Sequence, residues 1–197
     1  LDLKKNSVKA TFFITHASDI NDEIINQGHH IGLHPNFFPN STHGKSTLEI
    51  IEGLLKIANN ASSIRTHGLF QSTSLFIEIF SNFPQLKLDI SNLTYKSKYI
   101  ERTKMTYETA KFERINFNWE DDVTFFDQGF NWSSEVYYGK LNIYNFHPIH
   151  IFLNSCSMKN YEKLKSNIGN KNLNQLKKNE VSNFINYDSA GARTFLN

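Results

Sequence analysis

Histidines near the ends of short apolar runs are the residues of this sequence most suited to chemistry. The chain has eight histidines. Neutral imidazoles are good ligands for zinc and similar divalent metals, and they also act as acids and bases near neutral pH. If the apolar runs are parallel strands, the positions that follow them meet at one edge of a sheet, which is where such folds bind ligands. The residues that could converge there are His34, His43, Arg65, His67 and His147.

A histidine taken alone is more often a hydrogen-bonded structural or surface residue than a metal ligand. We assign His16 to that class. His29 and His150 join it, because each would have to lie beside a better candidate or point to the opposite face of its element.

The elements that would position these side chains alternate between strand and helix. Short apolar and β-branched runs predict strands over residues 8–14, 29–33, 64–67, 86–90, 115–117 and 141–146. Apolar residues at helical spacing predict helices over residues 18–26, 46–60, 73–83, 161–168 and 173–178, and residues 1–6 read as the end of another helix. In the first of these helices Ser18 or Asp19 is the expected cap, and Ile20, Ile24 and Ile25 share the expected apolar face. Repeated alternation favours a mainly parallel α/β fold.

The composition limits the class of protein. A length of 197 residues fits one domain, residues 1–197, with a single sizeable core. The net charge of +2 argues against a nucleic-acid partner, and no run is long and apolar enough to span a membrane. The one cysteine, Cys156, excludes an intramolecular disulfide and favours a cytoplasmic location. Seventeen Phe and eight Tyr indicate aromatic packing or, less commonly, walls of a sugar site.

Four short motifs occur in the order found in one enzyme family. They are residues 8–14 (VKATFFI), 28–34 (GHHIGLH), 65–67 (RTH) and 145–148 (NFHP). This series resembles carbohydrate esterase family 4, the NodB-like polysaccharide deacetylases, over most of the chain. Residues 34–39 and 147–151 are most similar to a divergent, WbmS-like branch found at lipopolysaccharide loci.

The resemblance implies a distorted (β/α)7 barrel and a divalent metal, usually zinc, held by one aspartate and two histidines. His34 matches the first metal histidine, whereas the position of the second is occupied by Phe38. His43 is the nearest replacement, with His67 as the alternative. The family's paired aspartates lie on a strand expected before Leu1. We therefore expect a fragment that lacks its first barrel strand and is inactive alone. The same reasoning leaves open that the domain is also incomplete at its C-terminus.

The resemblance also implies catalytic roles. His147 matches the general acid, and Arg65 matches the residue that orients the catalytic aspartate. Trp119 and Asp122 lie where the family has a pair that orients the acid histidine and walls the sugar site, although their order and residue type differ, and His67 would also contribute to that site. An exposed acidic turn beside a packed tryptophan is an equal alternative.

Three functions follow as hypotheses. The first is a metal-dependent hydrolase that removes N- or O-acetyl groups from a sugar of a surface polysaccharide, such as lipopolysaccharide, or of its precursor, with an N-acetylated carbohydrate as its partner. The second is a carbohydrate-binding pseudoenzyme that keeps the barrel but lacks the metal, as Phe38 would suggest. The third is an α/β domain with no role on sugars.

Overall fold

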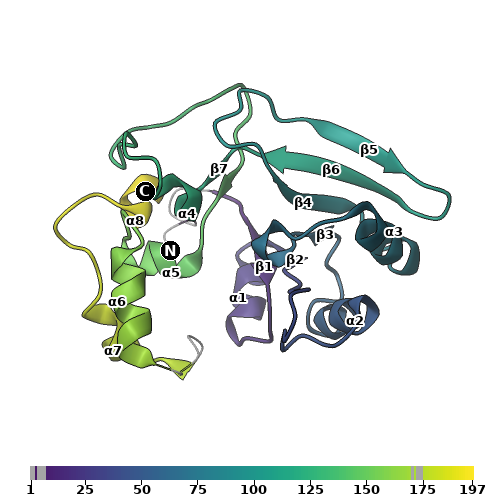
Figure 1. Cartoon of the computed structure of the whole chain (residues 1–197), viewed down its shortest axis with the longest axis horizontal. Helices are drawn as coiled ribbons and strands as arrows, with labels where there is room; N and C mark the ends of the chain where they lie inside the picture. The colour runs from purple at the N-terminus through teal and green to yellow at the C-terminus, as the bar shows by residue number, and fades with distance from the viewer. Residues whose placement is uncertain (1–2, 4–7, 170, 172–174) are drawn as a thin grey trace. The chain divides into compact units, whose positions relative to one another are not determined.

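The computed structural model describes residue 3, residues 8–169, residue 171 and residues 175–197. These residues form two compact units (Figure 1). Unit 1 comprises Leu1–Thr94 with Ile100–Phe117, and unit 2 comprises Tyr95–Tyr99 with Asn118–Asn197. The grouping of residues 1–197 into one domain stays a prediction.

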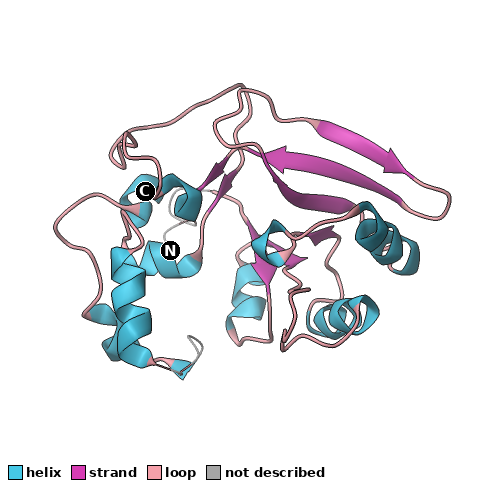
Figure 2. Ribbon diagram, viewed as in Figure 1, coloured by secondary structure: helices cyan, strands magenta, loops and turns pink. Residues whose placement is uncertain are grey.

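Unit 1 is built on a mixed sheet of six strands among its described residues (Figure 2). The strands, in their order across the sheet, are β1 (Thr11–Ile14), β2 (His30–Leu33), β3 (Ser63–Ile64), β4 (Leu88–Leu93), β6 (Lys111–Phe117) and β5 (Arg102–Thr106). All neighbouring pairs are parallel except β5 and β6, which form an antiparallel pair. The predicted parallel α/β class is therefore confirmed, and closure of the strands into a barrel stays a prediction.

The helices of unit 1 connect these parallel strands. They are α1 (Ile20–Asn26), α2 (Thr47–Ile57), α3 (Thr73–Asn82) and the short 3₁₀ helix η1 (His67–Leu69). Two of them begin at a serine cap: the Oγ atom of Ser46 accepts the N–H of Glu49, and that of Ser72 accepts the N–H of Leu75. Such caps satisfy amide donors that have no partner within the helix, which fixes where α2 and α3 begin.

The core of unit 1 combines aliphatic side chains of α2 and α3 with aromatic rings. Ile51 and Ile79 are fully buried. The rings of Phe80 and Phe112 stack with centroids 3.9 Å apart and planes at 7°, and this pair joins α3 to β6. Burial of this apolar surface is the main favourable term that holds helix on sheet.

The regular elements of unit 2 are mostly helices among its described residues. Its helices are α4 (Asp121–Thr124), α5 (Pro148–Leu153), α6 (Lys159–Ile168), α7 (Lys178–Ser182) and α8 (Ala192–Leu196). Two very short strands, β7 (Trp119–Glu120) and β8 (Tyr144–Asn145), pair in parallel. Trp119 is fully buried and stacks on Phe195 at 4.8 Å, so an aromatic cluster forms the centre of this unit.

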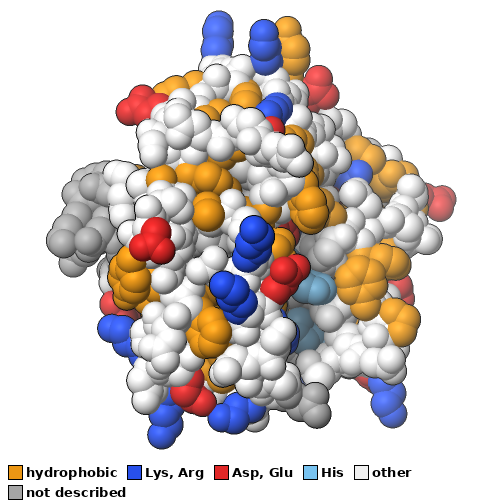
Figure 3. Space-filling model, turned by 60° about the vertical axis from the view of Figure 1, so that its left-hand side comes forward, with side chains coloured by type: hydrophobic (Ala, Val, Ile, Leu, Met, Phe, Trp, Pro, Cys, Tyr) orange, Lys and Arg blue, Asp and Glu red, His pale blue; other side chains and the backbone are white. Residues whose placement is uncertain are grey.

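Aromatic side chains are also exposed. Four of them in unit 2 are at least 74% exposed: Tyr99, Phe126, Tyr137 and Tyr187. On the face that Figure 3 shows, hydrophobic side chains are visible at several separate places, and basic and acidic side chains are interspersed among them. Scattered exposed hydrophobics of this kind are normal for a protein surface.

Most predicted elements are present with shifted ends, but two predictions were wrong. Ile20 and Ile25 are each 53% exposed, so only Ile24 of the predicted apolar face is buried. Asp19 makes no side-chain capping bond, whereas the Oγ atom of Ser18 accepts the N–H of Ile20 at 3.5 Å. Within the described part of the helix predicted over residues 173–178, residues 175–177 do not join an α-helix, and Lys178 is the first residue of α7. Residues 173–174, and residues 1–6 except Leu3, lie outside the described residues.

Replacing Ile79 by alanine should lower the free energy of unfolding of unit 1 by about 2–5 kcal/mol, because the lost methyl groups leave a cavity between α3 and the sheet. Glu78→Ala, at the exposed neighbouring position of the same helix, is the matched control and should change it by less than about 0.5 kcal/mol. Urea denaturation followed by circular dichroism measures both. Equal effects of the two substitutions would contradict the described packing of α3.

Candidate functional site

Three histidines of unit 1 follow three neighbouring parallel strands. His16 comes after β1, His34 directly after β2, and His67 shortly after β3. The strand ends are in register, since Ile14 pairs with Leu33 and Leu33 pairs with Ile64. The carboxyl ends of parallel strands meet at one edge, so these histidines belong to the same edge of the sheet.

His34 is held in one tautomer by a backbone carbonyl. Its Nδ1 atom lies 2.7 Å from the carbonyl oxygen of Arg65. A carbonyl oxygen can only accept a hydrogen bond, so Nδ1 carries the hydrogen, and the neutral ring keeps a lone pair on Nε2. Metal-binding histidines are typically oriented in this way, with one ring nitrogen bound to a carbonyl or carboxylate and the other left for the metal.

The lone pair of His34 faces His67. The Nε2 atom of His34 and the Nδ1 atom of His67 are 3.3 Å apart. The two rings meet edge to face, with centroids 5.3 Å apart. The structure therefore brings together His34 and the residue that the sequence offered as the alternative second ligand.

The backbone around these rings continues the pairing of β2 with β3. Arg65 donates its N–H to the carbonyl of Leu33, and His67 donates its N–H to the carbonyl of Pro35, each at 2.9 Å. Gly68 then turns the chain with a φ of 60°, a conformation that favours glycine. A Cβ atom at this position would come within 2.7 Å of the Phe38 ring, so a larger residue would displace that ring.

Phe38 occupies the position where the resemblance expects the second metal histidine. Its ring packs edge to face on His67, with centroids 5.9 Å apart, and also contacts Phe70 at 5.6 Å. Phe38 and Phe70 are 41% and 42% exposed. An aromatic surface thus lies beside the imidazole of His67, on the side chain that replaces the expected ligand.

His43 lies in the same neighbourhood but presents a different ring nitrogen. Its Nδ1 atom accepts the backbone N–H of Asn36 at 3.1 Å, so the hydrogen of the neutral ring is on Nε2. The pKa of His43 is lowered, first by burial and then by the positive charges that His67 and His16 would carry. In this conformation His43 braces the loop after β2, and its role as a metal ligand stays a prediction.

Arg65 is buried behind this edge of the sheet. The residue is only 5% exposed, and its guanidinium carbon lies 4.2 Å from the centroid of the Phe117 ring. A desolvated guanidinium held over a ring keeps a fixed orientation. Its role in orienting a catalytic aspartate stays a prediction.

In unit 2, His147 is bound to an aspartate that the sequence did not single out. The Nδ1 atom of His147 lies 2.6 Å from Oδ1 of Asp121, and the backbone N–H of His147 donates to Oδ2 of the same carboxylate at 2.8 Å. The pairing of β7 with β8 sets Glu120 opposite Asn145. Asp121 therefore follows β7 on the same edge where His147 follows β8.

The acidic surroundings change the titration of His147. Burial is the largest single influence and disfavours the imidazolium, but the hydrogen bond and charge of Asp121, with the charges of Asp122 and Glu120, outweigh it. The net result is a pKa of His147 above its ordinary value of 6.5. Such a histidine is protonated in a larger fraction of molecules near neutral pH, as a general acid requires.

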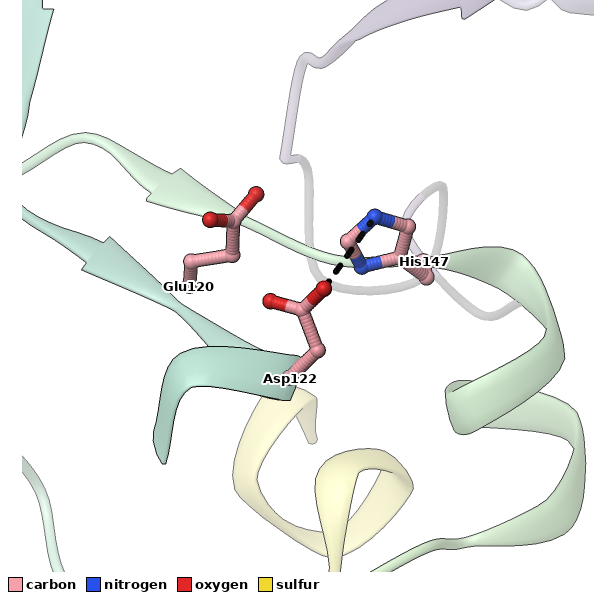
Figure 4. A group of neighbouring side chains, drawn as sticks. All are labelled: Glu120, Asp122 and His147. Atoms are coloured by element: carbon pink, nitrogen blue, oxygen red, sulfur yellow. Dashed lines mark ion pairs between the residues drawn. The ribbon is translucent and has the colours of Figure 1, made fainter. Parts of the chain in front are cut away.

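Asp122, the residue proposed from the sequence, contacts His147 at longer range. Its Oδ2 atom lies 3.9 Å from Nε2 of His147, and its side chain is 40% exposed (Figure 4). One ligand atom from each of Glu120, Asp122 and His147 lies within 4.8 Å of the others. The sequence identified this acidic run, but the choice of Asp121 over Asp122 depends on the direction of each side chain after β7.

Trp119 is a packed core residue, which the sequence offered as the alternative to a wall of the sugar site. It is fully buried, and its ring is surrounded by Trp132, Phe146 and Phe195 of the same unit. A side chain with no exposed surface offers none to a sugar in this conformation, so a contact of Trp119 with substrate stays a prediction.

The chain as a whole matches a known protein family. Residues 2–165 match the family described as WbmS-like polysaccharide deacetylase. The chain belongs to this family. A crystal structure of a candidate polysaccharide deacetylase involved in O-antigen biosynthesis, WbmS of Bordetella bronchiseptica, is similar, with 30% sequence identity and a TM-score of 0.79. The match covers 98% of this chain and 78% of the WbmS chain.

Membership of the WbmS-like polysaccharide deacetylases indicates a hydrolase of amide bonds. It confirms the resemblance drawn from the four motifs, including the finer assignment to the WbmS-like branch. No curated protein sequence matches the chain. Among the described residues, no helix is long and apolar enough to cross a membrane.

Asp121→Asn should lower the pKa of His147, because it removes the charge and weakens the hydrogen bond that favour the imidazolium. NMR titration of the ring protons measures this pKa. A pKa raised by folding stabilises the folded state fully below the ordinary value of 6.5 and no longer does so above the raised value. The variant should therefore lose more of its free energy of unfolding near pH 5 than near pH 8, two values on the order of one to two pH units either side of the ordinary imidazole pKa.

Asp122→Asn is the matched control for this titration. It removes the same charge from the neighbouring position, which lies 3.9 Å from the other ring nitrogen. We expect a smaller decrease in the pKa of His147. A larger decrease for Asp122→Asn than for Asp121→Asn would show that Asp122 is the main partner.

Proposed function

We propose that this chain is the hydrolytic domain of a metal-dependent deacetylase that removes N- or O-acetyl groups from a sugar of a surface polysaccharide or of its precursor. Membership of the WbmS-like family supports the reaction class. The role assigned to WbmS in O-antigen biosynthesis favours a lipopolysaccharide sugar as substrate. The observation that carries the proposal is His34, whose Nδ1–H is held by the Arg65 carbonyl while Nε2 faces His67.

The residues at this edge fit a divalent metal such as zinc. Two imidazole nitrogens bound to one tetrahedral zinc, each at about 2.0–2.1 Å, are separated by roughly 3.3–3.4 Å. The separation between His34 Nε2 and His67 Nδ1 is 3.3 Å. We therefore propose His34 and His67 as the two histidine ligands, in preference to His34 and His43.

A bound metal would polarise the acetyl carbonyl and lower the pKa of a water molecule, which is the chemistry that this family's reaction needs. The residues of the chain prepare for it. The carbonyl of Arg65 accepts the Nδ1 hydrogen of His34, so the lone pair of the neutral ring is on Nε2, the atom directed at His67. The N–H of His67, bound to Pro35, fixes the backbone from which the second imidazole extends.

His147 is proposed as the general acid. Asp121 binds its Nδ1 atom, so Nε2 is the atom free to give a proton to the departing amine of the sugar. The raised pKa keeps that proton available near neutral pH. Asp121 acts as a positioning residue, in the manner of the carboxylate that orients a catalytic histidine in hydrolases.

Sugar contacts are proposed for Phe38 and Phe70. Both rings are partly exposed and lie beside His67, and aromatic faces suit the apolar faces of sugar rings. Asp122 keeps its proposed role in binding substrate, because its carboxylate is partly exposed next to His147. The cytoplasmic location expected from the single cysteine stays a prediction.

A carbohydrate-binding pseudoenzyme is the second candidate. Phe38 favours it, because a phenylalanine that cannot bind metal stands at the expected ligand position and presents an aromatic surface instead. The two candidates differ in one measurable property. A hydrolase binds metal stoichiometrically through His34 and His67, whereas the pseudoenzyme binds sugar without it.

His34→Ala and His67→Ala should each lower the bound zinc of the full-length protein by at least about tenfold, since each removes one of few ligands. Elemental analysis after dialysis against trace zinc measures this without any assay of activity. His30→Ala is the control, because His30 is an exposed histidine of β2, the strand that His34 follows. This variant should keep its zinc.

His43→Ala separates the two ligand assignments. With His34 and His67 as ligands, this variant keeps its zinc, because its Nδ1 atom is already used by Asn36. Loss of zinc in His43→Ala with retention in His67→Ala would return the second ligand to His43. A full-length wild type that binds no zinc would favour the pseudoenzyme.

His147→Asn should lower the rate of acetate release from an N-acetylated oligosaccharide by about 100-fold to 10,000-fold, the usual contribution of a general acid. Its zinc content should equal that of the wild type, because the change leaves His34 and His67 intact. A variant that keeps the wild-type rate would exclude His147 as the acid. His30→Ala is again the control and should keep the wild-type rate. His150 does not serve as a control, because it is buried and its replacement would disturb packing.

A further inference from the structure

Unit 1 has a cavity that uses none of the histidines. It lies where α3 begins and has a volume of about 240 Å³. Its lining includes the arginine Arg114 of β6, three aromatic rings and the first residue of α3, namely Phe76, Tyr107, Phe112 and Thr73. None of the described lining residues is acidic. The cavity therefore combines one cation with apolar ring surface.

The guanidinium of Arg114 is held in place from two sides. Its Nε atom donates to Oδ2 of Asp89 at 2.6 Å, and its central carbon lies 4.7 Å above the centroid of the Phe76 ring. Asp89 is fully buried and accepts a second bond from the N–H of Ser91 at 3.0 Å. An arginine fixed in this way loses little further freedom when it binds a ligand.

The fixed guanidinium keeps donors for a ligand. Its two terminal nitrogens have no hydrogen-bond acceptor among the described residues, and the side chain is 24% exposed. Because Asp89 is bound through Nε and is fully buried, it lies behind the guanidinium with respect to solvent. Parallel N–H groups of this kind match the two oxygens of a carboxylate or phosphate.

The aromatic lining indicates what the uncharged part of the ligand is. Tyr107 and Phe112 lie nearly parallel, with planes at 24° and centroids 6.4 Å apart, and Phe76 packs on Phe112 at 5.9 Å. A cavity of about 240 Å³ is smaller than the usual site for a drug-sized ligand. It suits a single ring with one charged substituent.

We propose that this cavity binds the oxyanion of a small ring-bearing ligand, a carboxylate or a phosphate ester, through the guanidinium of Arg114. The proposal is independent of the deacetylase function, because the cavity shares no residue with the histidine edge. It assigns a second binding site to unit 1, in which the partly buried side chains of Tyr107 and Met105 face the ring, while the buried Phe76 and Phe112 contribute only the little surface that they expose.

Binding of four probes to the full chain tests this proposal by NMR chemical-shift perturbation and calorimetry. Glucuronate carries a carboxylate, glucose 6-phosphate carries a phosphate ester, glucose is the neutral match and inorganic phosphate has no ring. At least one ring-bearing anion should bind about tenfold or more tightly than glucose, since the guanidinium contacts depend on the charge. The preferred anion identifies the oxyanion, and weaker binding of inorganic phosphate confirms the contribution of the rings.

Two variants locate the binding. Met105→Trp fills the cavity from β5 without touching the ion pair of Arg114, and Arg114→Lys keeps a charge for Asp89 but removes the forked donors. Each should weaken binding of the preferred anion by about tenfold or more. Lys104→Gln is the matched control, because Lys104 pairs with Glu113 on the opposite face of β5 and should leave binding unchanged.

Circular dichroism and thermal unfolding identify variants that fold, and Met105→Trp remains decisive if Arg114→Lys does not fold. Three results would overturn the proposal. One is equal binding of glucose and both sugar anions, and another is no binding of either anion. The third is wild-type affinity in folded Met105→Trp, which would place the anion elsewhere.

Discussion

The hydrogen bonds that continue the β2–β3 pairing past its last residues fix the positions of His34 and His67 in unit 1. The strands themselves share only one pair, Leu33 with Ile64. Beyond it, the N–H groups of Arg65 and His67 bind the carbonyls of Leu33 and Pro35, and the Arg65 carbonyl receives the ring of His34. The same few bonds therefore set the separation of the two imidazoles and select the tautomer of one. A shift of this register by one residue would turn every side chain of the strand end to the other face.

In unit 2, too, a short parallel strand pairing fixes the positions of two polar side chains. Strands β7 and β8 have two residues each, too few to be stable alone, and the buried ring of Trp119 anchors them from one side. Their parallel pairing places a carboxylate after one strand and an imidazole after the other. Asp121 then binds both the ring and the backbone N–H of His147. In both units the candidate functional groups come shortly after short parallel strands, at the edge of the sheet where such folds bind ligands.

The longer elements could be predicted from sequence because their signals are local. Helix α2 has a serine cap and apolar residues at helical spacing, and its boundaries match the prediction closely. Strand β5 was missed because its residues, Arg102–Thr106, are mostly exposed, so no buried face marks it. Strand β7 is too short for alternation to appear. The exposed Ile20 and Ile25 of α1 show the converse, since apolar residues at helical spacing need not all find a partner.

The site residues show where local signals end. The sequence selected His34, His67 and His147; its preference for His43 over His67 as second ligand stays a prediction, and it named Asp122 where Asp121 is the residue bound to His147. Both choices depend on where a side chain points after the chain leaves a regular element, and no spacing rule carries that information. Asp121 is directed at His147 by the register of β7 with β8, and His67 is directed at His34 by its bond to Pro35.

Three imidazoles of this chain differ in chemistry because of what binds their Nδ1 atoms. At His34 a carbonyl takes the Nδ1 hydrogen and leaves a lone pair on Nε2, which suits a metal. At His43 a backbone N–H occupies Nδ1, so Nε2 carries the hydrogen and the ring is a donor. At His147 a buried carboxylate binds Nδ1 and helps to raise the pKa, which suits an acid. The residue type is the same in all three, and the fold alone supplies the Nδ1 partner that makes the rings differ.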